Sequence, residues 1–85
     1  MSLSCFGQTS TKDFVVVLDA GHGGKDTGNR GNGYMEKKIA LTIALEIGKQ
    51  LSSQKGIKVI YTRKDDRFVE LKNRAKIANQ ADADL

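Results

Sequence analysis

VVVLDAGHGG, residues 15–24, joins an apolar run to a glycine turn that carries the only histidine of the 85-residue sequence. The Val-rich run from Phe14 to Asp19 is typical of a β-strand that is covered on both faces. A second β-branched run spans residues 56–63 and begins with a glycine that can end a preceding helix. We therefore expect two strands, with His22 in the turn that follows the first.

The segment that follows the glycine turn and the segment that follows the second strand have the apolar periodicity of helices. Ile39, Ile43 and Ile47 recur every fourth residue within a predicted helix over 36–53. Small and aliphatic neighbours widen this apolar arc, so the helix is expected to pack between the sheet and a further element. A second helix is predicted over 69–81. Its narrower apolar stripe consists of Phe68, Leu71, Ala75 and Ala78.

This order of elements predicts an α/β fold, a βαβα unit with parallel strands. Strands 15–19 and 58–62 should be neighbours, and the helix over 36–53 should form a right-handed crossover between them. Residues 1–12 are polar and aperiodic, which indicates a disordered leader before a domain that covers 13–85.

The connector over residues 21–35 holds six of the nine glycines of the sequence. Glycine accepts tight and left-handed conformations, so a metal ion or a substrate backbone can approach such a loop closely. A structureless connector of this length is unusual in a compact domain unless it has a function. The alternative interpretation is a flexible linker.

His22 and Glu36 stand at the two ends of this connector and predict half of a zinc site. A neutral imidazole and a carboxylate are suitable zinc ligands, and a strand end and a helix start can each hold one of them. Catalytic zinc usually takes three protein ligands, and the sequence has no second histidine. Alternatively, His22 is a structural residue, and Glu36 is an acid favoured by the helix dipole and partnered by Lys37 or Lys38.

Two further alternatives concern the same turn. Asp19 either accepts a hydrogen bond that orients His22 or merely caps the turn. A nucleotide site is not expected, because the patterns GxGxxG and GxxxxGK[ST] both fail here. Gly24-Lys25, for example, is followed by Asp26, where a phosphate loop needs Ser or Thr.

Several motifs carry a resemblance to a known family. They are Val17–Gly24, Asp26-Thr27-Gly28, Glu36 at a helix start, Tyr61-Thr62-Arg63, and Arg74–Ala83. From about Asp13 to Leu85 the sequence resembles, in register, the zinc-dependent N-acetylmuramoyl-L-alanine amidases that cut peptidoglycan. The resemblance implies that His22 and Glu36 are zinc ligands and that the chain is the front part of a larger three-layer amidase domain.

In that family a strand bearing a second zinc histidine follows the segment that matches Ala81–Leu85, and a catalytic glutamate lies much further on. This chain contains neither residue. The resemblance therefore implies an amidase whose catalytic site is incomplete here, so that the 85-residue chain alone should be inactive. The alternative belongs to a different class of function: a non-catalytic fragment that binds wall glycans or has a regulatory role. Sequence downstream of Leu85 would separate the two.

Composition limits the classes of partner that this protein is expected to bind. The net charge of +4 is spread along the chain, which favours solubility over a nucleic-acid surface. No apolar run reaches the roughly 18 residues that a membrane span requires, and residues 1–13 lack the apolar middle of an export signal. Peptidoglycan as the partner and an extracytoplasmic location, in the periplasm or cell envelope, are implied by the resemblance alone. Oligomeric state is not indicated.

Overall fold

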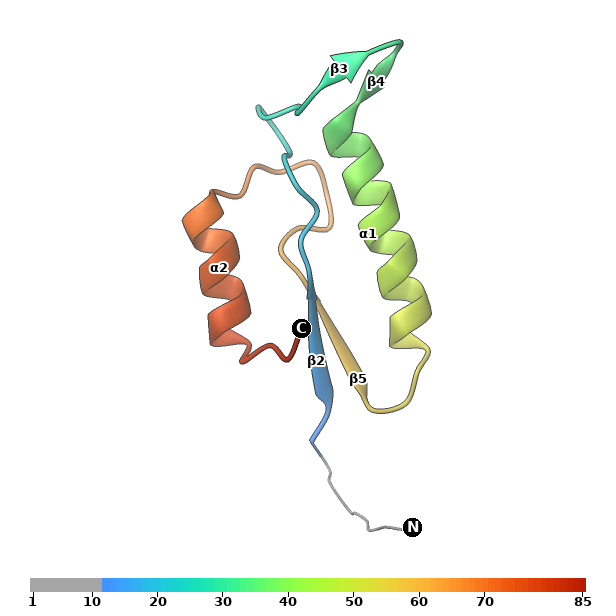
Figure 1. Cartoon of the computed structure of the whole chain (residues 1–85), viewed down its shortest axis with the longest axis vertical. Helices are drawn as coiled ribbons and strands as arrows, with labels where there is room; N and C mark the ends of the chain where they lie inside the picture. The colour runs from blue at the N-terminus through green and yellow to red at the C-terminus, as the bar shows by residue number, and fades with distance from the viewer. Residues whose placement is uncertain (1–11) are drawn as a thin grey trace.

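The computed structural model describes residues 12–85, so the predicted leader over 1–12 lies almost wholly outside the described residues. The elements follow the order β2 (Phe14–Leu18), β3 (Arg30–Gly31), β4 (Tyr34–Met35), α1 (Glu36–Ser52), β5 (Ile57–Tyr61) and α2 (Leu71–Gln80). Figure 1 shows β2 and β5 crossing at the centre, with α1 and α2 on opposite sides of them.

The two strands at the centre pair in parallel, which confirms the predicted α/β unit. Val16 of β2 stands opposite Val59 of β5 in the register. The other edge of β2 pairs with the last residue of the chain. The amide of Val17 donates to the carbonyl of Leu85 (2.9 Å), and the amide of Leu85 donates to the carbonyl of Val15 (3.2 Å). This pattern is that of a parallel ladder.

Helix α1 packs on β5 through its smallest residues. Ala44 and Gly48 are buried, and a Cβ at Gly48 would overlap the phenol of Tyr61. The isoleucines remain exposed: Ile39 by 46%, Ile43 by 54% and Ile47 by 44%. The two-stranded sheet therefore covers only part of the wide apolar arc, as expected from its width. The further element that would cover the rest stays a prediction.

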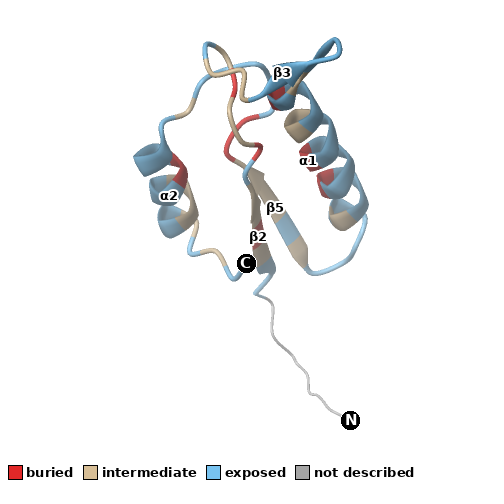
Figure 2. Ribbon diagram, turned by 45° about the horizontal axis from the view of Figure 1, so that its top comes forward, coloured by how far each residue is buried: buried red, intermediate tan, exposed pale blue. Residues whose placement is uncertain are grey.

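Helix α2 differs from its prediction in both start and buried face. It begins at Leu71 rather than at residue 69, and Leu71 itself is 85% exposed. The apolar stripe through Leu71 and Ala75 is thus exposed rather than buried within residues 12–85. In Figure 2 most of α2 is exposed, and its buried part, in red, is on the side that faces the strands. The buried residue of α2 is Arg74. Its guanidinium is drawn inward because it has carbonyl and carboxylate partners there.

The glycine connector contains a small hairpin that the sequence analysis did not predict. Strands β3 and β4 pair in antiparallel fashion, with Gly31 opposite Tyr34. Asn32 and Gly33 form the two-residue turn, and both have positive φ (51° and 82°). Asn-Gly between two strands is a strong hairpin signal, so the information was present in the sequence.

The part of the chain that the structure describes buries few apolar residues. The hydrophobic residues classed as buried are Val16, Ala20 and Ala44. Polar residues fill much of the remaining interior: Lys37, Thr62, Arg63 and Arg74. Within residues 12–85, no helix has the length and apolar character needed to cross a membrane.

Candidate functional site

The turn that carries His22 is held in place by two buried arginines. His22 follows the end of β2 with a φ of 66°, a left-handed conformation that a residue with a side chain adopts only under constraint. Its neighbours Ala20 and Gly21 expose backbone carbonyls toward the interior, where unpaired polar groups are costly. Arg63 and Arg74 donate to these carbonyls, and they thereby fix the path of the turn.

Arg63 joins the turn to the start of α1. It is only 3% exposed. Its Nε donates to the carbonyl of Ala20 (3.0 Å), and its Nη2 donates to the carbonyls of Gly21 (2.9 Å) and Lys37 (3.0 Å). These three carbonyls belong to the two segments that carry His22 and Glu36, and Nη1 donates to the carbonyl of Asp65 (2.8 Å). Arg63 therefore sets the distance between those segments.

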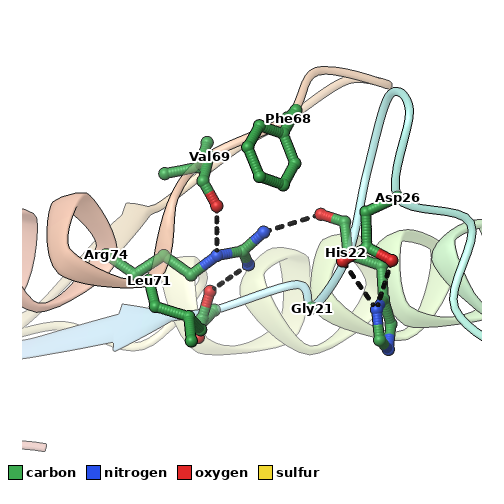
Figure 3. A pocket seen from close by; sticks show the side chains of 8 residues that line it. Gly21, His22, Asp26, Phe68, Val69, Leu71 and Arg74 are labelled. Atoms are coloured by element: carbon green, nitrogen blue, oxygen red, sulfur yellow. Dashed lines mark hydrogen bonds and ion pairs between the residues drawn. The ribbon is translucent and has the colours of Figure 1, made fainter.

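Arg74 reaches the same turn from α2. Its guanidinium donates to the carbonyls of Ala20 (2.7 Å) and His22 (2.7 Å) and pairs with Asp19 (2.6 Å). Figure 3 shows the contact with the carbonyl of His22 as a dashed line. The sequence analysis missed both arginines. The signal that could have found Arg74 is its position inside the apolar stripe of α2, three residues after Leu71.

The imidazole of His22 contacts an acid on each side. Its Nδ1 lies 3.0 Å and 3.1 Å from the two carboxylate oxygens of Asp26, and its Nε2 lies 3.3 Å from Oε1 of Glu36. Asp26, whose contact with His22 is drawn in Figure 3, also accepts from the amide of Gly28 (3.1 Å). The suggestion that Asp19 orients His22 is wrong, since Asp19 pairs with Arg74 and accepts from Thr62 (2.8 Å).

Glu36 turns back toward the loop from the first turn of α1. Its Oε1 accepts from the amide of Asn29 (2.9 Å), so the carboxylate is fixed beside His22. Gly28 makes this approach possible. Its φ is 65°, and a Cβ there would lie 2.7 Å from Oε1 of Glu36 and 2.8 Å from Cδ2 of His22. The loop can therefore bring the two side chains together only if residue 28 is glycine.

Hydrogen bonds set the charge states in this cluster. The hydrogen bond to Asp26 raises the pKa of His22 above its usual value, and Glu36 adds to the effect. The amide of Gly28 lowers the pKa of Asp26, and the amide of Asn29 lowers the pKa of Glu36. Both acids are thus ionised at neutral pH. Since an ionised Asp26 can only accept, Nδ1 of His22 must carry the proton.

This proton assignment leaves an unusual juxtaposition on the other side of the ring. In the neutral imidazole, Nε2 then has only a lone pair, and it faces the anionic Oε1 of Glu36 at 3.3 Å. Two acceptors at this distance repel each other. The arrangement becomes favourable when a proton on Nε2 or a cation lies between them, so His22 and Glu36 suit a shared cation.

Lys37 has a different partner from the one suggested by the sequence. Its ammonium donates to Asp66 (2.9 Å) and to the carbonyl of Gly24 (3.0 Å), while Asp66 accepts from the amide of Gly24 (2.8 Å). The suggestion that Lys37 neutralises Glu36 is therefore wrong. This buried lysine fastens the start of α1 to the glycine turn.

An open pocket of about 460 Å³ lies beside His22. Figure 3 shows Phe68, Val69 and Leu71 above and beside the turn, with His22 and Asp26 at the far end. His22 is thus accessible from a concave surface. Across residues 12–85, however, no cluster of three or more His, Cys, Asp or Glu side chains is arranged to hold a metal ion.

A family model for N-acetylmuramoyl-L-alanine amidases matches residues 16–85. The chain belongs to this family. It is 49% identical over 71 residues to an endolysin of Bacillus phage SPP1, covering 84% of this chain and 26% of the endolysin. It is 47% identical over 72 residues to the N-acetylmuramoyl-L-alanine amidase AmiA of Escherichia coli, covering 84% and 25% respectively.

Solved structures of amidases have the same fold over this region. An N-acetylmuramoyl-L-alanine amidase from Clostridium difficile 630 superposes with a TM-score of 0.83 at 39% identity, covering 87% of this chain and 41% of that one. The catalytic domain of CwlV from Bacillus (Paenibacillus) polymyxa gives 0.80 at 44% identity, covering 81% and 40%. The chain thus spans about a quarter of the two curated relatives and about two fifths of these structures.

Proposed function

We propose that this chain is the N-terminal part of the catalytic domain of a zinc-dependent N-acetylmuramoyl-L-alanine amidase, with His22 and Glu36 as two of the zinc ligands. The observation that carries the proposal is the 3.3 Å separation of Nε2 and Oε1. Two donors of a tetrahedral zinc site, each about 2.0–2.1 Å from the metal, lie about 3.3–3.4 Å apart. The spacing and the donor types both fit zinc.

Asp26 supports the same role for His22. Ligating histidines usually donate their second ring nitrogen to a carboxylate or a carbonyl, which fixes the tautomer and the orientation of the ring. Asp26 occupies this position on Nδ1. The hydrogen bond leaves Nε2 free to bind a metal ion, which is the state that a ligand requires.

The edge of β2 indicates where a further ligand would come from. Leu85 already pairs with β2 in parallel, beside Val15 and Val17. Parallel strands bring their carboxyl ends to the same edge of a sheet, and His22 follows the carboxyl end of β2. Residues that continued this pairing would approach His22. The strand with a second zinc histidine that the resemblance implies would therefore deliver its ligand to this point.

The reaction proposed is hydrolysis of the amide between N-acetylmuramic acid and L-alanine in peptidoglycan. Zinc would supply Lewis-acid activation of the amide carbonyl and of water. Asp26 holds a proton at Nδ1 of His22, and the two arginines hold the turn rigid. The general base is expected to be a glutamate further along the reading frame, as the resemblance implies. Because peptidoglycan lies outside the cytoplasm, the proposed location is the periplasm or cell envelope.

The test uses the protein expressed from the complete reading frame. The wild type is expected to bind one zinc per active site and to hydrolyse a muropeptide, whereas His22→Ala and Glu36→Ala lose bound zinc and activity together. Glu46→Ala is the matched control, since this exposed acid of α1 contacts Gln50 on the solvent side. A Glu36→Ala protein that keeps stoichiometric zinc by elemental analysis would overturn the ligand assignment.

The 85-residue chain alone is expected to be inactive. It supplies two metal donors and no general base, and loss of a general base alone typically lowers the rate about 10²–10⁴-fold. Chelator-sensitive release of peptide from a muropeptide by a sample whose intact mass matches this chain would contradict the proposal.

A further inference from the structure

A second concave surface adjoins the candidate site at Glu36. It is a groove of about 360 Å³ formed by the β3–β4 hairpin and the first turns of α1. We call it the hairpin groove, and it is lined by Asn29, Arg30, Asn32, Tyr34, Glu36 and Ile39, among others. Glu36 belongs both to the groove and to the candidate metal site. A substrate group bound in this groove would therefore lie next to the metal site at which the amide bond is cleaved.

The hairpin groove presents groups that have no partner within residues 12–85. The ring of Tyr34 is 64% exposed and packs on no other ring. The guanidinium of Arg30 is exposed and makes no hydrogen bond or ion pair there. Asn29 and Asn32 add exposed amide side chains. An open aromatic ring beside amide and guanidinium donors is chemically suited to a sugar, whose C–H face packs on the ring while its hydroxyl and acetamido oxygens accept hydrogen bonds.

The hairpin is held rigidly enough to act as a preformed site. Asn32-Gly33 closes a two-residue turn, and the register pairs Arg30 with Met35. The amide of Glu36 donates to the carbonyl of Asn29 (2.9 Å), so the hairpin is tied to the start of α1. Little conformational entropy would be lost on binding, which favours recognition by this surface.

The concave surfaces beside His22 and beside Glu36 present different sets of side chains. The pocket beside His22 contains the apolar side chains of Phe68, Val69 and Leu71. The hairpin groove beside Glu36 instead combines the apolar surfaces of Tyr34 and Ile39 with the polar side chains of Asn29, Arg30 and Asn32. The scissile amide of the proposed substrate joins a sugar to a peptide that begins with alanine, and the hairpin groove offers both the aromatic ring and the hydrogen-bond donors that suit the sugar side.

We propose that the hairpin groove binds the N-acetylmuramoyl sugar of the substrate, with Tyr34 as the stacking platform and Arg30 as a donor to sugar oxygens. This inference rests on the proposed amidase function and assigns the glycan side of its site. Tyr34 and Arg30 are specificity-determining residues in this assignment.

The test compares two substrates of the protein from the complete reading frame. One is an N-acetylmuramoyl peptide, and the other is the same peptide carrying only a D-lactoyl group, without the sugar ring. Tyr34→Ala is expected to raise the KM for the sugar-bearing substrate about five- to tenfold, with kcat nearly unchanged, and to leave the sugar-free substrate unaffected. Tyr34→Phe, which keeps the ring, should behave as the wild type. Arg30→Ala should act like Tyr34→Ala, and Lys55→Ala is its charge-matched control.

Equal effects of Tyr34→Ala on both substrates, or no effect on either, would overturn the assignment while leaving the amidase function intact. If the wild type hydrolyses neither substrate, the proposed function fails. A binding experiment then tests the sugar-binding assignment of the groove. A peptide-free N-acetylglucosaminyl–N-acetylmuramic acid disaccharide should then shift the side-chain amide signals of Asn29 and Asn32 in NMR spectra of the wild type but not of Tyr34→Ala. Absence of that shift in the wild type overturns the inference.

Discussion

Replacing Gly28 with alanine should separate the two candidate zinc ligands. A Cβ at this position would lie 2.7 Å from Oε1 of Glu36 and 2.8 Å from Cδ2 of His22, whereas ordinary contact begins at 3.4 Å. Oε1 of Glu36 must therefore move by about 0.7 Å and Cδ2 of His22 by about 0.6 Å, and each shift exceeds the roughly 0.5 Å tolerance of a preorganised site. We expect zinc affinity to fall about 10–100-fold, the range seen when groups that orient ligands are lost.

The substitution has two effects that must be distinguished. One is the free-energy cost of a non-glycine residue at positive φ, and the other is the steric contact of the new Cβ with His22 and Glu36. Gly28 has a φ of 65°, and a non-glycine residue in this region costs about 1–2 kcal/mol. Gly56 provides the control, because its φ is 84° and a Cβ there meets nothing within 4 Å. Gly56→Ala should destabilise the protein by a similar amount in urea unfolding and should leave zinc affinity unchanged.

The assay is a competition titration with a chromophoric chelator on the protein from the complete reading frame, alongside urea unfolding of each variant. Gly28→Ala and Gly56→Ala should show similar losses of stability, and only Gly28→Ala should release zinc more readily. Wild-type zinc affinity in a folded Gly28→Ala protein would refute the reasoning, because His22 and Glu36 would then not hold the metal at the spacing observed.

Three further outcomes follow from the contacts around the turn. Asp26→Ala should lower zinc affinity about 10–100-fold in the same titration while the fold is retained by circular dichroism, since the imidazole loses the acceptor that orients it. Arg74→Met should destabilise the protein by about 1–3 kcal/mol in urea unfolding, because the backbone carbonyls of Ala20 and His22 and the half-exposed carboxylate of Asp19 lose their donor, while the exposed Arg67→Met should cost less than about 1 kcal/mol. Lys37 lowers the pKa of Asp66, so this stabilisation is present above about pH 4 and is lost as the pH falls through the lowered value. Urea midpoints of Asp66→Asn should accordingly depend less steeply on pH in the acid range than those of the wild type.

The sequence was sufficient to predict those helices and strands that form from the hydrophobic pattern of one continuous segment. The Val-rich run at 14–19, the β-branched run at 56–63 and the four-residue periodicity after Glu36 predicted β2, β5 and α1 closely. The parallel pairing followed from the order of these elements. Their apolar patterns are repeated over several residues, so each prediction rested on many side chains rather than one.

Single polar residues with distant partners were less predictable. Arg63 and Arg74 were noted only as parts of motifs, and Lys37 or Lys38 was suggested as a partner for Glu36. In the fold each instead reaches a backbone carbonyl or a carboxylate from another segment. The orienting role that was one of two alternatives for Asp19 belongs to Asp26 for the same reason, since the glycine turn brings the carboxylate of Asp26 to Nδ1 of His22.

By itself, the sequence determined the two strands, the crossover helix and the pairing of one histidine with one glutamate at the ends of a glycine loop. These features depend on patterns of hydrophobicity and on glycine, which act over short distances along the chain. The tertiary structure decided that Nε2 of His22 and Oε1 of Glu36 lie 3.3 Å apart, that Asp26 holds the ring, and that two buried arginines fix the turn. Hydrogen-bond geometry between segments depends on how the whole chain packs, and no local pattern encodes it.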